Sequence, residues 1–255
     1  MFSKVDRLMH ITVHEDKSAL GAAAAEGAAA IRAAIEAEGK ASIIVATGAS
    51  QFEVLDALIQ EEIDWTKVTA FHLDEYVGVH ADHPASFRGY LRDRFVNRID
   101  GLKEFVPVDG SADDLDAAIS ALNRRIAQEE IAVCFAGIGE NCHLAFNDPP
   151  ADFEIETPFI VVTLDEACRR QQMGEGWFAT LEDVPERAVS MSIHQIMKSK
   201  KLIISVPDQR KAKAVVAAVE GRVTVDAPAS ILQRHGACAL HLDVDSASLL
   251  KPPAD

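Results

Sequence analysis

Positions 131–149 carry the stretch IAVCFAGIGENCHLAFNDP, in which an apolar run ends at two closely spaced glycines and is followed by polar residues. The run Ile131–Ala136 holds no charged or amide side chain, so it predicts a strand that is buried on both faces. Strands of that kind belong to parallel sheets that are covered by helices. The stretch therefore indicates an α/β fold.

Short apolar runs like this one alternate with longer segments of helical periodicity along the chain. The predicted strands are Ser42–Ala46, Val68–Leu73, Ile131–Ala136, Phe159–Leu164, Ala188–Ser192, Lys201–Val206 and Ala239–Val244. The predicted helices are Asp16–Glu38, Gln51–Ile63, Ser86–Ile99, Asp113–Glu129, Gln209–Glu220 and Ala229–Arg234. Because neither a repeat nor a linker interrupts the alternation, residues 1–255 are expected to form a single doubly wound domain, with a mostly parallel sheet flanked by helices on both faces.

The overall composition is that of a soluble globular protein, with 48% hydrophobic and 25% charged residues among 255. The net charge of −15 disfavours nucleic acid and anionic membranes as partners, although a few local cations still suffice for one small anion. The first ten residues are too polar for a secretory signal, no apolar run reaches the length of a membrane span, and the four cysteines lack CxxC spacing. We expect a cytoplasmic protein with reduced thiols.

The loop after the strand Ser42–Ala46 consists of Thr47, Gly48, Ala49 and Ser50. Ligands of doubly wound sheets bind beyond the carboxyl ends of the strands, which is where this loop lies. Its glycine lets backbone amides approach an anion, its hydroxyls donate further hydrogen bonds, and the helix that follows adds positive potential. The loop therefore predicts a phosphate cradle; the alternative is a capped turn without a ligand.

Two adjacent carboxylates, Asp74 and Glu75, follow the predicted strand Val68–Leu73. Because like charges repel, at least one of the two is expected to have an altered pKa if the pair is partly buried, and such a carboxylate can serve as a general base. The alternative is a solvated acidic loop. His80 and His83 lie downstream, but their spacing matches no zinc or iron signature, so no metal site is expected.

The polar part of the stretch 131–149 brings His143 close to acids and amides. Histidine is the side chain best suited to proton exchange near neutral pH, and a neighbouring acid or amide can fix its tautomer. The alternative is a structural histidine, because Leu144 and Phe146 beside it are apolar.

Taken together, these loops resemble the glucosamine-6-phosphate deaminase (isomerase) family, which shares a fold with the 6-phosphogluconolactonases. The family's Leu-Asp-Glu-Tyr-Val-Gly block is similar to residues 73–78, with Asp-His-Pro at 82–84. Its Gly-x-Gly-x-[Asp/Asn]-Gly-His-x-x-Phe-Asn-Glu-Pro block is similar to residues 137–149. The segment 208–212 resembles the family's phosphate-lysine block and would bring Lys211 to the phosphate.

The resemblance implies isomerisation and deamination of an amino-sugar phosphate, glucosamine 6-phosphate to fructose 6-phosphate and ammonia, without a cofactor or a metal. It implies that His143 opens the sugar ring and that Asp74 carries a proton between C2 and C1. Glu75, Asn141 and Asp148 would complete the catalytic site. The partner implied is a small sugar phosphate.

Three departures from the family pattern bear on this expectation. Asp148 replaces the usual Glu and is one methylene shorter, so its contact with the histidine is either lost or remade. The family's phosphate-binding arginine is missing where this chain has Gly176, and Arg169 or Arg170 is the expected substitute. The segment 150–154 lacks the serine and arginine that bind an allosteric phosphate, so we expect an unregulated monomer or small homo-oligomer.

Two other functions stay open at this point. A 6-phosphogluconolactonase also carries the Gly-x-Gly-x-Asp-Gly-His pattern, but it typically continues into Ser-Leu-Phe-Pro, where this chain has Phe-Asn-Asp-Pro at 146–149. A non-catalytic sugar-phosphate sensor usually adds a DNA-binding module, and the sequence shows no such extension.

Overall fold

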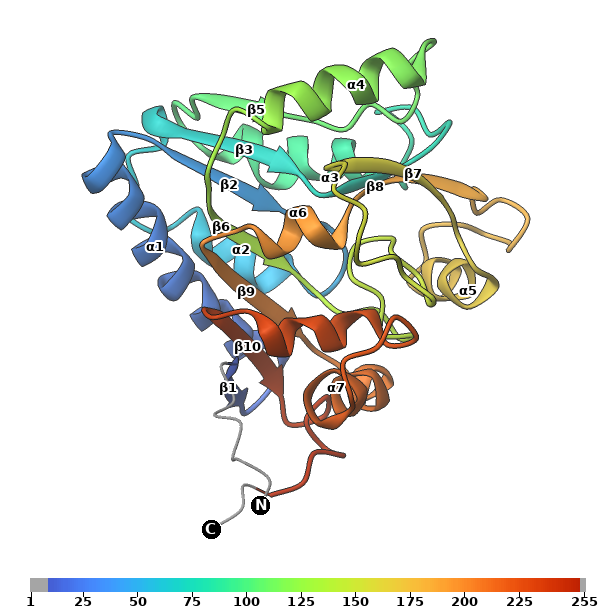
Figure 1. The fold of residues 1–255 in the computed structure, drawn as a ribbon. Coiled ribbons are helices and arrows are strands. Elements are labelled where there is room, and N and C mark those ends of the chain that lie inside the picture. The colour runs from blue at the N-terminus through green and yellow to red at the C-terminus, as the bar shows by residue number, and fades with distance from the viewer. Residues whose placement is uncertain (1–8, 253–255) are drawn as a thin grey trace.

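A computed structural model describes residues 9–252 of the chain (Figure 1). Its main sheet has seven strands in the order β1-β10-β9-β6-β2-β3-β5, and every neighbouring pair is parallel. The strands are β1 (Met9–His14), β2 (Ala41–Val45), β3 (Val68–His72), β5 (Glu104–Val106), β6 (Ile131–Ala136), β9 (Lys201–Val206) and β10 (Cys238–Asp243). The predicted parallel sheet is confirmed, with the stretch at 131–136 as its central strand.

Helices cover both faces of this sheet, as predicted. They are α1 (Ala23–Glu38), α2 (Phe52–Leu58), α3 (Phe87–Arg94), α4 (Leu115–Ile126), α5 (Glu166–Gly174), α6 (Ile193–Met197) and α7 (Ala212–Glu220). Neighbouring residues of one strand serve different cores: Ile43 packs with residues of α1 and α2, whereas Ile44 packs with residues of α4, α6 and α7. This two-sided burial is the reason why the central strands are continuously apolar. Among the helices of residues 9–252, none is long and apolar enough to cross a membrane.

The helix boundaries differ from the predicted ones mainly through short 3-10 turns. The predicted helix Asp16–Glu38 begins as a 3-10 helix, Lys17–Ala22, and ends at Gly39, whose positive φ of 73° gives the expected C-terminal stop. The predicted helix Gln51–Ile63 ends at Leu58. Further 3-10 turns are η2 (Trp65–Lys67), η3 (Val96–Arg98), η4 (Gln209–Lys211) and η5 (Pro228–Arg234).

A second sheet, which the sequence did not predict, lies beyond the carboxyl end of β3. It consists of β4 (Asp74–Tyr76), β8 (Arg187–Met191) and β7 (Phe159–Thr163), and its pairs are antiparallel. Two apolar runs assigned to the main sheet, Phe159–Leu164 and Ala188–Ser192, belong here instead. The physical reason is visible in β7, which alternates between buried and more exposed residues because an antiparallel sheet can leave one face to solvent.

Helix α1 approaches the central strand closely at a single glycine. Gly27 stands among alanines and is buried, and a Cβ atom at this position would lie 2.3 Å from the ring of Phe135 on β6. That distance is far below van der Waals contact, so the alanine-rich helix needs glycine here for packing, although alanine is the better helix former.

We predict that Gly27→Ala lowers the free energy of unfolding by about 1–2 kcal/mol, because the overpacking penalty exceeds the helix propensity of about 1 kcal/mol that alanine contributes. Urea unfolding would measure the change. Ala29→Gly, at an exposed position of the same helix, calibrates the propensity alone. A Gly27→Ala protein that is as stable as wild type would contradict this packing argument.

Candidate active site

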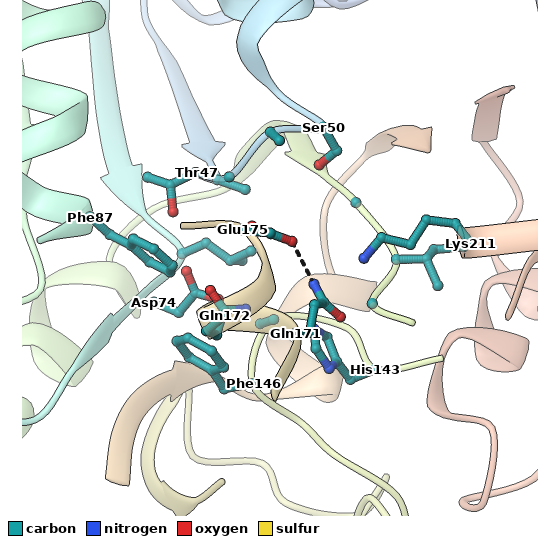
Figure 2. Close-up of a pocket in the computed structure, with 18 of the residues that line it drawn as sticks. Thr47, Ser50, Asp74, Phe87, His143, Phe146, Gln171, Gln172, Glu175 and Lys211 are labelled. Atoms are coloured by element: carbon teal, nitrogen blue, oxygen red, sulfur yellow. Dashed lines mark hydrogen bonds between the residues drawn. The ribbon is translucent and has the colours of Figure 1, made fainter. Parts of the chain in front are cut away.

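One cavity at the carboxyl edge of the main sheet collects the three loops singled out in the sequence (Figure 2). It is lined by residues that follow β2, β3, β6 and β9, and by one face of α5. Parallel strands bring their carboxyl ends to the same edge, and this explains why segments separated by more than a hundred residues meet.

Asp74 is the first residue of β4 and lines this cavity while being almost completely buried. Burial, and then the negative charge of Glu75, raise the pKa of the Asp74 carboxyl to about 8. Because a general base works best when its pKa lies near the operating pH, this carboxyl is suited to taking up and returning a proton near neutrality.

Glu75 does not line the cavity. Its carboxylate accepts hydrogen bonds from the backbone N–H groups of Tyr76, Phe87 and Arg88, at 2.9, 3.2 and 2.7 Å, and from Ser86 Oγ at 2.9 Å. Three of these four donors stand at the beginning of α3, where the helix dipole favours a negative charge. Its placement is therefore that of a positioning residue, which anchors β4 to α3.

His143 is buried, and one edge of its ring faces the cavity. Its Nδ1 atom lies 3.0 Å from Asp148 Oδ1. The ring packs on Gly139 so closely that a Cβ at that position would be 2.3 Å from Nε2. The carboxylate is placed to accept a hydrogen bond from Nδ1–H, and this contact fixes the orientation of the ring.

Asp148 contacts His143, although its side chain is one methylene shorter than the glutamate usual in the family. Its Oδ1 also accepts from Asn141 Nδ2 at 3.0 Å, and its Oδ2 accepts from the backbone N–H of Asp165 at 3.0 Å. Burial acts to raise the pKa of Asp148, but the hydrogen bonds and charge of His143 outweigh burial and bring that pKa below its ordinary value. The carboxylate therefore stays ionised. Asn141 and Asp148 orient the histidine from behind rather than facing the cavity.

Cys168 joins this cluster from α5, and its sulfur lies within 4.8 Å of ligand atoms of His143 and Asp148. Such a trio is geometrically capable of holding a metal ion. Burial, and the charges of Asp148 and Asp165, raise the pKa of the Cys168 thiol far above its ordinary value. Since a thiol binds a metal as the thiolate, and Nδ1 of the histidine is committed to the carboxylate, the residues fit a hydrogen-bonded cluster better than a metal centre.

The opposite end of the cavity carries an unpaired cation. Lys211 is buried, and within residues 9–252 its Nζ has neither a hydrogen bond nor an ion pair; burial lowers its pKa. Thr47 Oγ1 is also buried without a hydrogen-bond partner in the described chain. Gln51 Nε2 donates to Ser50 Oγ at 3.1 Å, which leaves the hydroxyl proton of Ser50 free to donate. Figure 2 shows Ser50 on the side of the cavity where Lys211 lies, and Thr47 nearer Phe87 and Asp74; a lone cation with a free hydroxyl on its side is suited to an anion such as phosphate.

The neighbouring glycines keep this end open. Gly48 has a positive φ of 92°, which L-residues with a Cβ rarely adopt. A Cβ at Gly137 would lie 2.6 Å from Ser50 Oγ. Ala49 completes the loop and lines the cavity as well. The predicted cradle of residues 47–50 therefore faces the lysine.

The two arginines expected to replace the missing phosphate ligand do not reach the cavity. Arg169 donates to the carbonyl oxygens of Leu181 and Val184, at 2.6 and 3.0 Å, and Arg170 is an exposed partner of Glu166. The reason is helical geometry, because the face of α5 that turns to the cavity bears Gln171, Gln172 and Glu175. The expectation that either arginine lines the site is wrong.

The arginine that does line the cavity is Arg210, next to Lys211, and it pairs with Glu140 at 3.1 Å. Sequence reasoning missed its role, although it had singled out the segment 208–212 that contains it. The same reasoning missed Gln171, Gln172 and Glu175, because α5 had not been predicted as a helix.

Residues 15–240 match the family model for glucosamine-6-phosphate isomerases/6-phosphogluconolactonase. The chain belongs to this family. It is 37% identical to a glucosamine-6-phosphate deaminase of Exiguobacterium sibiricum over 84% of this chain and 82% of the relative, and 36% identical to one of Oenococcus oeni over 81% and 85%. The resemblance inferred from the sequence is confirmed.

Solved structures of the same family share the fold. A monomeric glucosamine-6-phosphate deaminase aligns with a TM-score of 0.85 and 29% identity, covering 95% of this chain and all of that one. The 6-phosphogluconolactonase of Trypanosoma brucei aligns with a TM-score of 0.76 and 20% identity, covering 95% and 98%. At that identity the lactonase shows the fold alone.

We predict that Asp74→Asn stabilises the protein, and that the gain grows as pH rises. The folded chain keeps a proton on Asp74 up to about pH 8, whereas the unfolded chain releases it near its ordinary pKa of 3.8. The free energy of unfolding that this group contributes to the wild-type protein is therefore lost as pH rises through that window, and a neutral amide avoids the loss, which amounts to about 5 kcal/mol at pH 8. Urea unfolding at about pH 4 and pH 8 measures it. An equal gain in the free energy of unfolding at both pH values would show that the pKa of Asp74 is not raised in the folded protein.

Proposed function

We propose that this protein converts glucosamine 6-phosphate into fructose 6-phosphate and ammonia in the cytoplasm. The observation that carries the proposal is that one cavity holds a carboxyl with a pKa of about 8, a histidine whose Nδ1 contacts Asp148, and a lysine without a partner among residues 9–252. Curated relatives that are 33–37% identical over more than four-fifths of this chain and carry the name glucosamine-6-phosphate deaminase support it.

In the proposed reaction, Lys211 and the loop 47–50 bind the phosphate, and the C1–C2 end of the sugar reaches Asp74 and His143. His143 Nε2 accepts the proton of the C1 hydroxyl and passes it to the ring oxygen, which opens the ring. Each such transfer by a positioned side chain contributes on the order of 10² to 10⁴ in rate.

Asp74 in its ionised form then removes the C2 proton from the open-chain aldehyde, while O1 takes up a proton that the C2 ammonium gives up. The protonated Asp74 returns its proton to C1 of the resulting enolamine. This step moves the double bond to the C2–nitrogen pair and gives a protonated imine. Water adds to the imine carbon, and ammonia leaves as the ketone forms. None of these steps uses an oxidant or a reductant, so the mechanism requires no redox cofactor.

We predict that His143→Gln and Asp74→Asn each reduce turnover at least about 100-fold, because each removes a proton carrier from the reacting atoms. Ammonia release from glucosamine 6-phosphate measures the effect, and far-ultraviolet circular dichroism checks that the variants fold. Near-normal activity of either variant would show that its assigned role is wrong.

The rival activity within the family is hydrolysis of a 6-phosphogluconolactone. The decisive experiment incubates the protein separately with hexosamine 6-phosphates and with the lactone, and follows ammonia release and lactone loss. Lactone loss without ammonia would replace the proposal with a lactonase. Phosphate-ester binding without ammonia, lactone loss or hydrogen exchange at C2 in deuterated water would indicate a non-catalytic sensor.

We also propose that the enzyme acts without allosteric activation, as a monomer or small homo-oligomer. The segment 150–154 presents Asp152 and Glu154 to solvent, and these acids would repel a regulatory phosphate. The structural likeness to a monomeric deaminase is in keeping with a small assembly. We predict a hyperbolic rate curve; a sigmoidal curve relieved by N-acetylglucosamine 6-phosphate would contradict the proposal.

A further inference from the structure

The cavity is too small for the proposed substrate in the conformation described. Its volume is about 80 Å³, whereas pockets that enclose small molecules begin at about 300 Å³. The side chains that enter from α5 are Gln171, Gln172 and Glu175 (Figure 2). These side chains therefore border the space that a substrate would enter.

Glu175 caps the carboxyl end of α5 and reaches the phosphate end of the cavity. Its Oε1 accepts from Gln171 Nε2 at 2.9 Å, and Gln171 Oε1 in turn accepts from the backbone N–H of Glu140 at 2.8 Å. On the cradle side, a Cβ at Gly48 would lie 3.9 Å from Glu175 Oε2. The carboxylate is thus held between the loop at 137–143 and the loop at 47–50.

At the Lys211 end of the cavity, the positive charge of the lysine is balanced by nearby carboxylates of the protein itself. Three carboxylates act on Lys211, and among them Glu175 acts most strongly, ahead of Glu140 and Asp208. Glu140 has a partner of its own in Arg210. Glu175 therefore supplies negative charge to a buried lysine that has no direct partner among residues 9–252. A phosphate bound beside Lys211 would meet this carboxylate as a like charge at close range.

We infer that Glu175 holds the place of the substrate phosphate in the conformation described and leaves it when a phosphate binds. The inference rests on the proposed function in one respect, that this end of the cavity takes a phosphate.

Moving Glu175 away from this place costs free energy, so only a fraction of the molecules has the site open to an anion. The apparent affinity for any anion is reduced by that fraction. A sugar phosphate offsets this cost through its contacts with the Asp74 and His143 end of the cavity. Inorganic phosphate makes no such contacts. Both ligands meet the same cost, so Glu175 keeps the occupancy of the site by free phosphate low, while the ester still binds through its additional contacts.

The test is Glu175→Gln, which keeps the size of the side chain and an oxygen for Gln171 but removes the charge. Titration calorimetry with inorganic phosphate is expected to give a dissociation constant about tenfold lower than that of wild type, equivalent to about 1.4 kcal/mol. The matched control is Glu166→Gln, which removes one charge from the same helix at an exposed position outside the cavity. It should leave phosphate binding unchanged.

Two results would overturn the inference. Unchanged or weaker phosphate binding by Glu175→Gln would mean that the carboxylate is not a competitor of the anion. Equal tightening by Glu166→Gln would mean that the net charge of the protein, rather than the place of Glu175, sets the affinity.

A second readout uses turnover, and it separates this inference from the proposed function. If the protein releases ammonia, Glu175→Gln should lower KM for glucosamine 6-phosphate several-fold; a raised KM would show that Glu175 binds the substrate, and would also overturn the inference. If neither protein releases ammonia but phosphate binding still tightens in the variant, the proposed function fails while the role of Glu175 stands.

Discussion

The site depends on the way in which Glu75 is held by the first turn of α3. Its carboxylate accepts three hydrogen bonds there, two from backbone N–H groups and one from Ser86, and a fourth from the backbone N–H of Tyr76. Successive side chains of a strand point to opposite faces, so anchoring Glu75 on one side of β4 turns Asp74 to the other, into the cavity. The buried charge of Glu75 then helps to keep the pKa of Asp74 high. The hydrogen bonds fix Glu75 in place, and Asp74 beside it is left with a pKa near neutrality.

The two carboxyls nearest the chemistry are shifted in opposite directions, and this divides their roles. The pKa of Asp74 is raised because burial and a like charge oppose its ionisation, whereas the pKa of Asp148 is lowered by donors that include the histidine. A group whose protonation changes near neutrality can carry a proton, and one that stays ionised can only orient its partner. His143 contacts the ionised carboxylate of Asp148 through Nδ1 and lines the same cavity as Asp74.

The sequence allowed the parallel sheet and the convergence of the loops to be predicted, because a fully apolar strand such as Ile131–Ala136 has few alternatives to two-sided burial. It did not reveal the antiparallel sheet, since β7 and β8 have the same short apolar runs as the main sheet, and only β7 alternates between buried and more exposed residues. Arg169 and Arg170 were assigned by charge alone. Their true orientation follows from the helical phase of α5, which a short polar segment without apolar periodicity does not disclose.

Helix α5 connects the two ends of the site. At its beginning, Asp165 accepts from Cys168 N and donates its own backbone N–H to Asp148, so this end is joined to the histidine cluster. At its other end, Glu175 stands by the phosphate cradle. The last turn of α5 is joined to the loop at 137–143, because Gln171 donates to Glu175 and accepts from the backbone N–H of Glu140. One short helix therefore ties both ends of the cavity to the loop that carries His143, so its position affects both ends at once.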